Sequence, residues 1–198
     1  KDLSKKELSL EKILATAISL MERTYIRIGN SEYEKTNGSF GLTTLKDQHV
    51  KIDGTTMQFL FKGKKGISHK ITLTNAKLAR IVKQSRDIPG KELFQYYDEN
   101  GNTHSIDSGM VNRYIREITG EEFTAKDFRT WAGTLNALEA FKELGIGNTQ
   151  SETKKKLIDA LDYVSKKLGN TRTVCKKYYV HPVIIDLFEK QSLSEYLK

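Results

Sequence analysis

The chain has a single cysteine, Cys175, among its 198 residues, so no intramolecular disulfide can form. Cysteine and histidine also do not recur at the spacing of zinc ligands, which argues against a structural metal. A chain without structural cysteines is typical of a reducing compartment. We therefore expect a cytoplasmic protein that needs no metal or other cofactor.

Long apolar runs are also missing. No stretch approaches the roughly 18 consecutive apolar residues of a membrane span, and the start, Lys1-Asp2-Leu3-Ser4-Lys5-Lys6, lacks the apolar core of a signal peptide. The first residue is not Met, so we expect a piece of a longer protein. Internal repeats and low-complexity segments are absent, and the length allows one domain or two small ones.

Positive charge is in excess. Lys and Arg number 33 against 25 Asp and Glu, which gives a net charge of +8 and a pI near 9.4. This balance favours an anionic partner such as nucleic acid. A basic protein without such a partner remains the alternative on charge alone.

The hydrophobic period changes once along the chain. A helical spacing over residues 9–23 predicts an amphipathic helix, and its apolar positions are Leu10, Ile13, Leu14, Ala17, Ile18 and Met21. From Gly41 to Leu73 the period is two, with a turn signal at Asp53-Gly54, which predicts a three-stranded meander. Its second turn, residues 62–66, carries three lysines.

Helical spacing then returns and persists to the end of the chain. The predicted helices cover about 75–83, 108–118, 124–144, 151–168 and 183–190. The loops between them fall at 88–90, 98–101 and 145–148. The sequence thus predicts an α+β fold: a helix and a small antiparallel sheet in 1–74, then a helical lobe in 75–198.

Two arginines and a lysine suit the chemistry of a phosphodiester. Arginine donates two hydrogen bonds to a phosphate and stays charged, and Arg27 and Arg129 are the candidates. Arg129 follows Thr124, which can cap a helix whose N-terminus would favour a bound phosphate. Lys64 can act as cation and proton donor, although Lys62 and Lys65 in the same turn remain open. The lysines are not part of a nucleotide-binding loop, because the G-x-x-x-x-G-K-[ST] pattern is missing.

Two adjacent tyrosines are the last candidates for a role in this chemistry. Tyr178 and Tyr179 follow Gly169-Asn170 and precede Pro182. Neighbouring residues on a helix point about 100° apart, so the two cannot share a face. The neutral phenol, with a pKa of about 10 when unperturbed, is a poor nucleophile and needs nearby cations to favour its anion.

Three further residues are candidates for phosphate contact: Tyr33, Lys35 and Lys46.

These motifs together resemble the type IB DNA topoisomerases of poxviruses and bacteria. The resemblance covers about Leu10 to Pro182 and rests on four segments in the same order: Tyr25-Ile26-Arg27-Ile28-Gly29-Asn30 with Gly41-Leu42-Thr43-Thr44-Leu45, Phe61-Lys62-Gly63-Lys64-Lys65, Lys126-Asp127-Phe128-Arg129-Thr130-Trp131, and Gly169-Asn170 with Tyr179. It implies the recombinase/topoisomerase catalytic fold. It also selects Tyr179 as nucleophile, three residues before the proline, and leaves Tyr178 to packing.

The resemblance implies a role for each remaining site residue. Arg27, Lys64, Arg129 and Asn170 would act with the nucleophile, and Tyr33, Lys65 and Lys126 would contact DNA. Asn170 stands where the poxviral enzymes have histidine; its amide can donate a hydrogen bond to phosphate but cannot transfer a proton. The implied reaction is ATP-independent relaxation of supercoiled duplex DNA through a 3′-phosphotyrosyl intermediate.

The resemblance also bears on the setting of the protein and on its rivals. It implies a nucleoid-associated monomer whose β-rich N-terminal clamp domain is absent from this chain. A tyrosine recombinase would share the arginines and the nucleophile, but its residue three before the second arginine is usually histidine, where this chain has Lys126. A DNA-binding protein without enzymatic activity would explain the charge but not the spacing.

Overall fold

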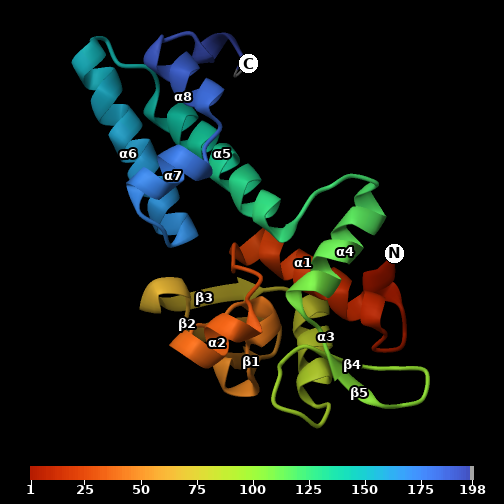
Figure 1. Ribbon diagram of the computed structural model, residues 1–198. Coiled ribbons are helices and arrows are strands. Elements are labelled where there is room, and N and C mark those ends of the chain that lie inside the picture. The colour runs from red at the N-terminus through yellow and green to blue at the C-terminus, as the bar shows by residue number, and fades with distance from the viewer. Residues whose placement is uncertain (197–198) are drawn as a thin grey trace. The chain divides into compact units, whose positions relative to one another are not determined.

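The computed structural model describes residues 1–196. These residues form two compact units, Lys1–Lys126 and a second unit that begins at Asp127. Helices make up most of both, and the first also contains a small antiparallel sheet (Figure 1). The predicted α+β class is confirmed. No helix in the described part of the chain is long and apolar enough to cross a membrane.

Helix α1, Leu10–Thr24, is central to the first unit. Its apolar residues recur every three or four positions, so Ile13, Ala17 and Leu20 lie on one face and are fully buried. The helix ends where Tyr25 adopts the left-handed conformation, with φ of 55°. This ending directs the chain into the extended segment that contains Arg27.

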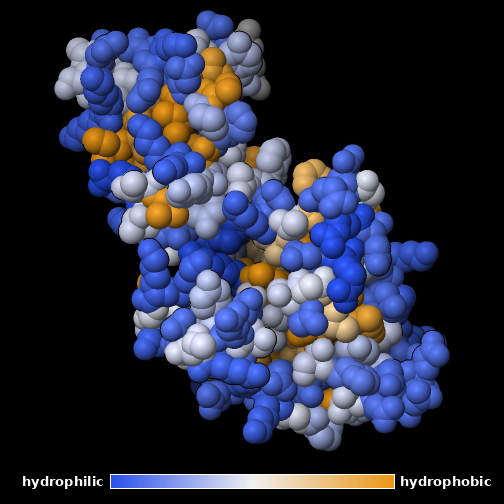
Figure 2. Space-filling model, in the orientation of Figure 1, coloured by the Kyte–Doolittle hydropathy of each residue, from blue (hydrophilic) through white to orange (hydrophobic). Residues whose placement is uncertain are grey.

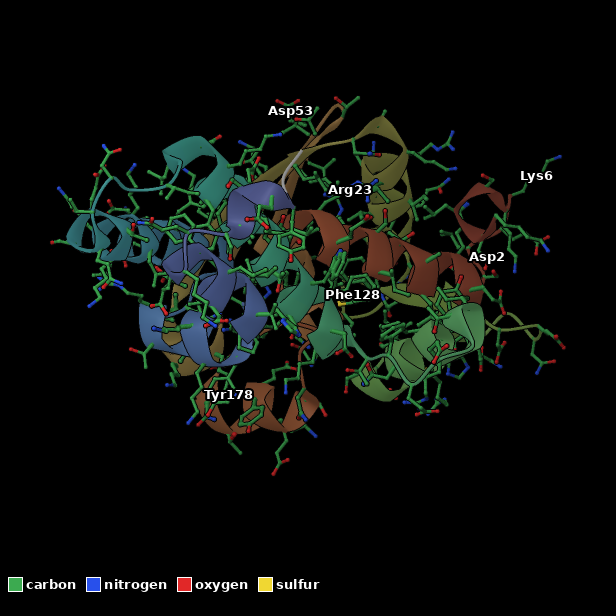
Figure 3. The ribbon with its side chains drawn as sticks, turned by 90° about the horizontal axis from the view of Figure 1, so that it is seen from above. Asp2, Lys6, Arg23, Asp53, Phe128 and Tyr178 are labelled. Atoms are coloured by element: carbon green, nitrogen blue, oxygen red, sulfur yellow. The ribbon has the colours of Figure 1, made fainter. Side chains whose placement is uncertain are left out.

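Three strands form the antiparallel meander that the sequence predicted. They are β1 (Val50–Asp53), β2 (Thr56–Lys62) and β3 (Ser68–Thr74), in the order β1-β2-β3. On β2 the side chains of Met57, Phe59 and Phe61 are buried and alternate with half-buried or exposed ones. Asp53 lies at the β1–β2 turn and is labelled in Figure 3.

Three further elements of the first unit pack against α1: α3 (Ala76–Arg86), β4 (Gln95–Tyr97) and α4 (Ser108–Thr119). Strand β5 (Thr103–Ser105) pairs with β4. The N-terminal turn lies beside α4, because Tyr114 donates a 2.6 Å hydrogen bond to Asp2 (Figure 3). Burial, followed by this hydrogen bond to the Asp2 carboxylate, raises the pKa of Tyr114. Hydrophilic side chains cover most of the visible face of the unit (Figure 2).

Within residues 127–196 the second unit consists of helices and their connections. The α-helices are α5 (Ala125–Leu144), which begins just before the unit boundary, α6 (Gln150–Leu168), α7 (Arg172–Tyr178) and α8 (Pro182–Glu189). The rings of Phe141 on α5 and Phe188 on α8 stack with centroids 4.0 Å apart, so α8 packs against α5. Leu161 and Val164 on α6 are buried with Cys175 of α7, so α7 lies against α6 (Figure 1).

The structure adds elements that the sequence analysis did not predict. These are α2 (Ser31–Asn37), α7 and the β4–β5 hairpin, whose turn is the predicted loop at 98–101. The division also falls elsewhere: α3 and α4 contact α1 and belong to the first unit, which extends to Lys126 rather than to residue 74. The boundary between the two units therefore follows the contacts with α1 and not the change from strands to helices along the chain.

Candidate active-site residues

Arg27 lies in an extended segment that is held by backbone hydrogen bonds. Leu42 N–H donates to the Arg27 carbonyl and Thr43 N–H to the Ile28 carbonyl, both at 2.8 Å. Gly29 and Gly41 face each other so closely that a Cβ atom on Gly41 would overlap the Gly29 backbone. Because neither glycine has a side chain, the segment that contains Arg27 and the segment that contains Gly41 can lie this close together. Their contact fixes the backbone at Arg27.

Lys64 lies on the turn between β2 and β3. Gly63 N–H donates to the Ile67 carbonyl at 2.7 Å, and Lys65 adopts the left-handed conformation with φ of 63°. A Cβ atom on Gly63 would come within 2.7 Å of the His69 ring, which stacks on Phe61 at 5.0 Å. Glycine is therefore the residue that lets this turn fold back over His69 and present its lysines outward.

These residues of the first unit share one surface cavity. It has a volume of about 640 Å³, and its lining includes Arg27, Tyr33, Lys62, Lys64 and Lys65. The Lys64 ammonium lies 5.5 Å from the centre of the Tyr33 ring, within the range of a cation–π contact. The cavity thus gathers four cations and the aromatic rings of Tyr33 and Phe40, and its cations suit a phosphate group.

Lys46, one of the candidates for phosphate contact, is engaged in two ion pairs. Its ammonium is paired with the Glu34 carboxylate at 2.8 Å and with Glu92 at 2.9 Å. Burial disfavours the ammonium form, but the hydrogen bonds to Glu34 and Glu92 outweigh it and raise the pKa of Lys46. An ammonium between two carboxylates is already neutralised, so Lys46 is a poorer candidate for phosphate contact than the lysines that line the cavity.

In the second unit Arg129 is buried, with 5% of its surface exposed. Its Nη2 donates a 2.6 Å hydrogen bond to the Leu168 carbonyl at the end of α6. Its guanidinium carbon lies 5.3 Å from the centre of the Tyr179 ring. Arg129 therefore fixes a positive charge beside the aromatic ring that the resemblance selected as nucleophile.

Tyr179 immediately follows α7, and its backbone is held from two sides. Its N–H donates to Cys175 at 3.0 Å, and its carbonyl accepts from the Thr134 hydroxyl at 3.3 Å. A Cβ atom on Gly133 would overlap the Tyr179 carbonyl, so only glycine allows α5 to approach this closely. Tyr178, labelled in Figure 3, is 54% exposed, with the Lys177 ammonium near its ring. The two tyrosines thus have different surroundings, as their spacing predicted. The packing role that the resemblance implied for Tyr178 is wrong, because its side chain is mostly exposed.

Asn170 lies close to Arg129 through a shared acceptor. Its Nδ2 donates to the Leu168 carbonyl at 3.4 Å, the same oxygen that accepts from Arg129. Gly169 ends α6 in the left-handed conformation and Thr171 caps α7 by accepting from Val174 N–H. Asn170 is thereby placed in the short link between the two helices. Lys126, one residue after the start of α5, is exposed.

The structure also gives roles to residues that the sequence analysis did not name. Gly133 and Thr134 hold the backbone of Tyr179, and His181 N–H donates to the Thr134 hydroxyl at 3.0 Å. A glycine in the middle of a predicted helix was the available signal, since such a glycine is destabilising unless another backbone approaches it. Among residues 1–196 no cluster of His, Cys, Asp and Glu could hold a metal ion.

Comparison with known sequences shows which proteins this chain is similar to. A family model described as "Eukaryotic DNA topoisomerase I, catalytic core" matches residues 1–195. The DNA topoisomerase 1B of Acanthamoeba polyphaga mimivirus is 30% identical over 189 residues, which cover 90% of this chain and 55% of that protein. The DNA topoisomerase 1B of Vaccinia virus (strain Copenhagen) is 23% identical over 184 residues, 92% of this chain and 55% of its own. The chain spans about half the length of these curated relatives.

Comparison with solved structures gives a related fold. The XerH site-specific recombinase, crystallised with a palindromic difH substrate in a post-cleavage complex, matches with a TM-score of 0.55 and 17% identity. The match covers 99% of this chain and 48% of the recombinase. At this identity the likeness concerns the fold alone.

Proposed function

The chain belongs to the type IB DNA topoisomerase family, and we propose that it is the catalytic part of an enzyme that relaxes supercoiled duplex DNA. The observation that carries this proposal is the position of Arg129 beside the Tyr179 ring, at 5.3 Å. A fixed guanidinium there places a positive charge beside the attacking tyrosine. It also supplies charge for the phosphate oxygens during attack.

In the proposed reaction the Tyr179 hydroxyl gives its proton to solvent water and its oxygen attacks a backbone phosphorus. A phosphorus–tyrosine bond forms at the 3′ side as the bond from phosphorus to the 5′ oxygen breaks. Lys64 gives its proton to the departing 5′ oxygen, and takes it back when the 5′ hydroxyl attacks to reseal the strand. The covalent link preserves the phosphodiester energy, so neither ATP nor a redox partner enters the balance.

The other site residues support the phosphate. Arg27 and Arg129 donate charge-assisted hydrogen bonds to its non-bridging oxygens. Asn170 donates a neutral hydrogen bond and takes no part in proton transfer, because an amide has no proton to give at working pH. Tyr33, Lys65 and Lys126 contact neighbouring phosphates. A cytoplasmic, nucleoid-associated setting is part of the proposal, since duplex DNA is the substrate.

The test incubates the protein with supercoiled plasmid in the absence of ATP and magnesium. We expect relaxed topoisomers, and a covalent protein–DNA adduct when the reaction is stopped with denaturant. Tyr179→Phe should abolish the adduct, since no other oxygen replaces the phenol, whereas Tyr178→Phe, at the exposed neighbouring ring, should retain it. An adduct in Tyr179→Phe would assign the nucleophile elsewhere.

Strand exchange by a recombinase is the second candidate, favoured by the fold it shares with XerH. A recombinase joins ends from two duplexes, whereas relaxation reseals one. Two labelled duplexes of different length distinguish the reactions: a topoisomerase returns the parental lengths, and a recombinase produces recombinant ones. The Lys126 position, where recombinases usually carry histidine, leads us to expect parental products.

A further inference from the structure

Helix α2 carries a residue of the cavity but has little to hold it in place. It has seven residues, Ser31–Asn37, and none of them is buried. Its single aromatic side chain, Tyr33, is 50% exposed. A helix of one or two turns is marginal by itself and depends on tertiary contacts for its stability. Since apolar packing is missing among these residues, polar contacts must fix α2.

Local contacts secure the two ends of the helix. Asn30 caps the N-terminus by accepting from Glu32 N–H at 2.7 Å, and Gly38 ends the helix in the left-handed conformation. Caps of this kind define where a helix begins and ends. They do not define where it lies on the rest of the unit.

Glu34 provides a contact from α2 to a distant part of the chain. Its carboxylate pairs with the Lys46 ammonium at 2.8 Å, and the same ammonium pairs with Glu92 at 2.9 Å. The three side chains are only 21–33% exposed, so solvent screens the pairs less than it screens ordinary surface ion pairs. The pairs tie α2 to the segment before β4.

The far end of this connection is anchored by the backbone. Lys46 and Glu92 form an isolated antiparallel bridge, and Leu93 N–H donates to the Leu45 carbonyl at 2.8 Å. Ser105 of β5 donates a long hydrogen bond, 3.4 Å, to the second oxygen of Glu92. Lys46 therefore extends from a fixed backbone, with Glu92 holding its ammonium toward α2.

We infer that Lys46, through its pairs with Glu34 and Glu92, is a positioning residue that sets α2 and hence the Tyr33 ring against Lys64. This inference rests on the proposed function, in which Lys64 is the proton donor. One face of α2 contributes Glu34 to the ion pairs, and the adjacent residue Tyr33 lines the cavity with the Lys64 ammonium 5.5 Å away. A shift of α2 would move the ring and leave the lysine without its neighbour.

The test is a double-mutant cycle on single-turnover cleavage of a DNA duplex. Lys46→Met removes the charge, keeps the length of the side chain and leaves two carboxylates facing each other. We expect cleavage to slow by about 10- to 100-fold, the scale of a small misplacement of reacting groups. Lys46→Arg should stay within about threefold of the parent, because a guanidinium can pair with both carboxylates.

The coupling to Tyr33 separates positioning from a general loss of structure. In a Tyr33→Ala background, Lys46→Met should add no more than about a twofold change, because the ring that Lys46 positions is already missing and the two effects are coupled. A defect of the same size in both backgrounds would overturn the inference, since Lys46 would then act by another route.

Amide hydrogen exchange provides a measurement that does not need DNA cleavage. Residues 31–37 should exchange faster in Lys46→Met than in the parent, while Lys46→Arg should match the parent. Equal exchange in Lys46→Met and the parent would overturn the inference whatever the activity. A parent protein that forms no covalent adduct would instead refute the proposed function, and the exchange result would still decide whether Lys46 holds α2.

Discussion

Lys64 differs from its two neighbouring lysines in its surroundings. Its ammonium lies near the Tyr33 ring, whereas the Lys62 side chain runs beside Gly66 and Lys65 follows in the left-handed conformation. The face of an aromatic ring attracts an ammonium group, so this contact fixes the direction of the lysine side chain. This distinction supports Lys64 over Lys62 and Lys65, an alternative that sequence alone left open.

Lys64→Ala should therefore slow cleavage of an ordinary phosphodiester by about 100-fold or more, since general acid catalysis contributes a factor of this order. Replacing the bridging 5′ oxygen with sulfur should restore most of the rate, because a thiolate departs without a proton. Lys62→Ala and Lys65→Ala are the matched controls, and neither should respond selectively to sulfur. Rescue in one of these two variants instead of Lys64→Ala would move the acid to that residue.

Short elements decide how well this fold can be predicted from its sequence. Helix α1 and the strands β1–β3 follow from apolar residues at period 3.6 and 2, and the structure confirms them. Helices α2 and α7 were missed because periodicity needs buried positions: α2 buries none and α7 buries only Cys175. Tyr33 and Tyr179 belong to these two helices or adjoin them. The motif spacing identified Tyr33 and Tyr179 from the sequence. The contacts of Lys46 and Gly133 could be found only in the folded structure.

Gly133 tests whether the α5–α7 contact sets the nucleophile. Gly133→Ala should favour helix α5 by about 1 kcal/mol in propensity, yet its methyl group would displace the Tyr179 backbone. We expect single-turnover cleavage to fall about 100-fold. Gly109→Ala in α4 is the control, because its methyl would meet only the Asp107 and Arg113 side chains. Equal activity of the two variants would show that Tyr179 tolerates a shift of its backbone.

At the scale of the whole molecule, the net charge of +8 can act on DNA in two ways. A long-range field attracts any polyanion and depends on total charge, whereas a direct phosphate contact depends on where each cation lies. Cations already paired with carboxylates, such as Lys190 with Asp186 at 2.8 Å, contribute to the first and little to the second. Cations that line the cavity, such as Lys65, can contribute to both.

Two substitutions that lower the net charge equally distinguish these contributions. Lys65→Ala and Lys190→Ala are each placed in a Tyr179→Phe background, which prevents covalent capture, and DNA affinity is measured against salt concentration. The slope of log affinity against log salt changes by about 0.9 for each phosphate contact. We expect Lys65→Ala to reduce the slope by about one such unit and Lys190→Ala to leave it unchanged. If both variants shift affinity alike with no change in slope, binding reflects the field of the whole protein, and Lys65 makes no phosphate contact.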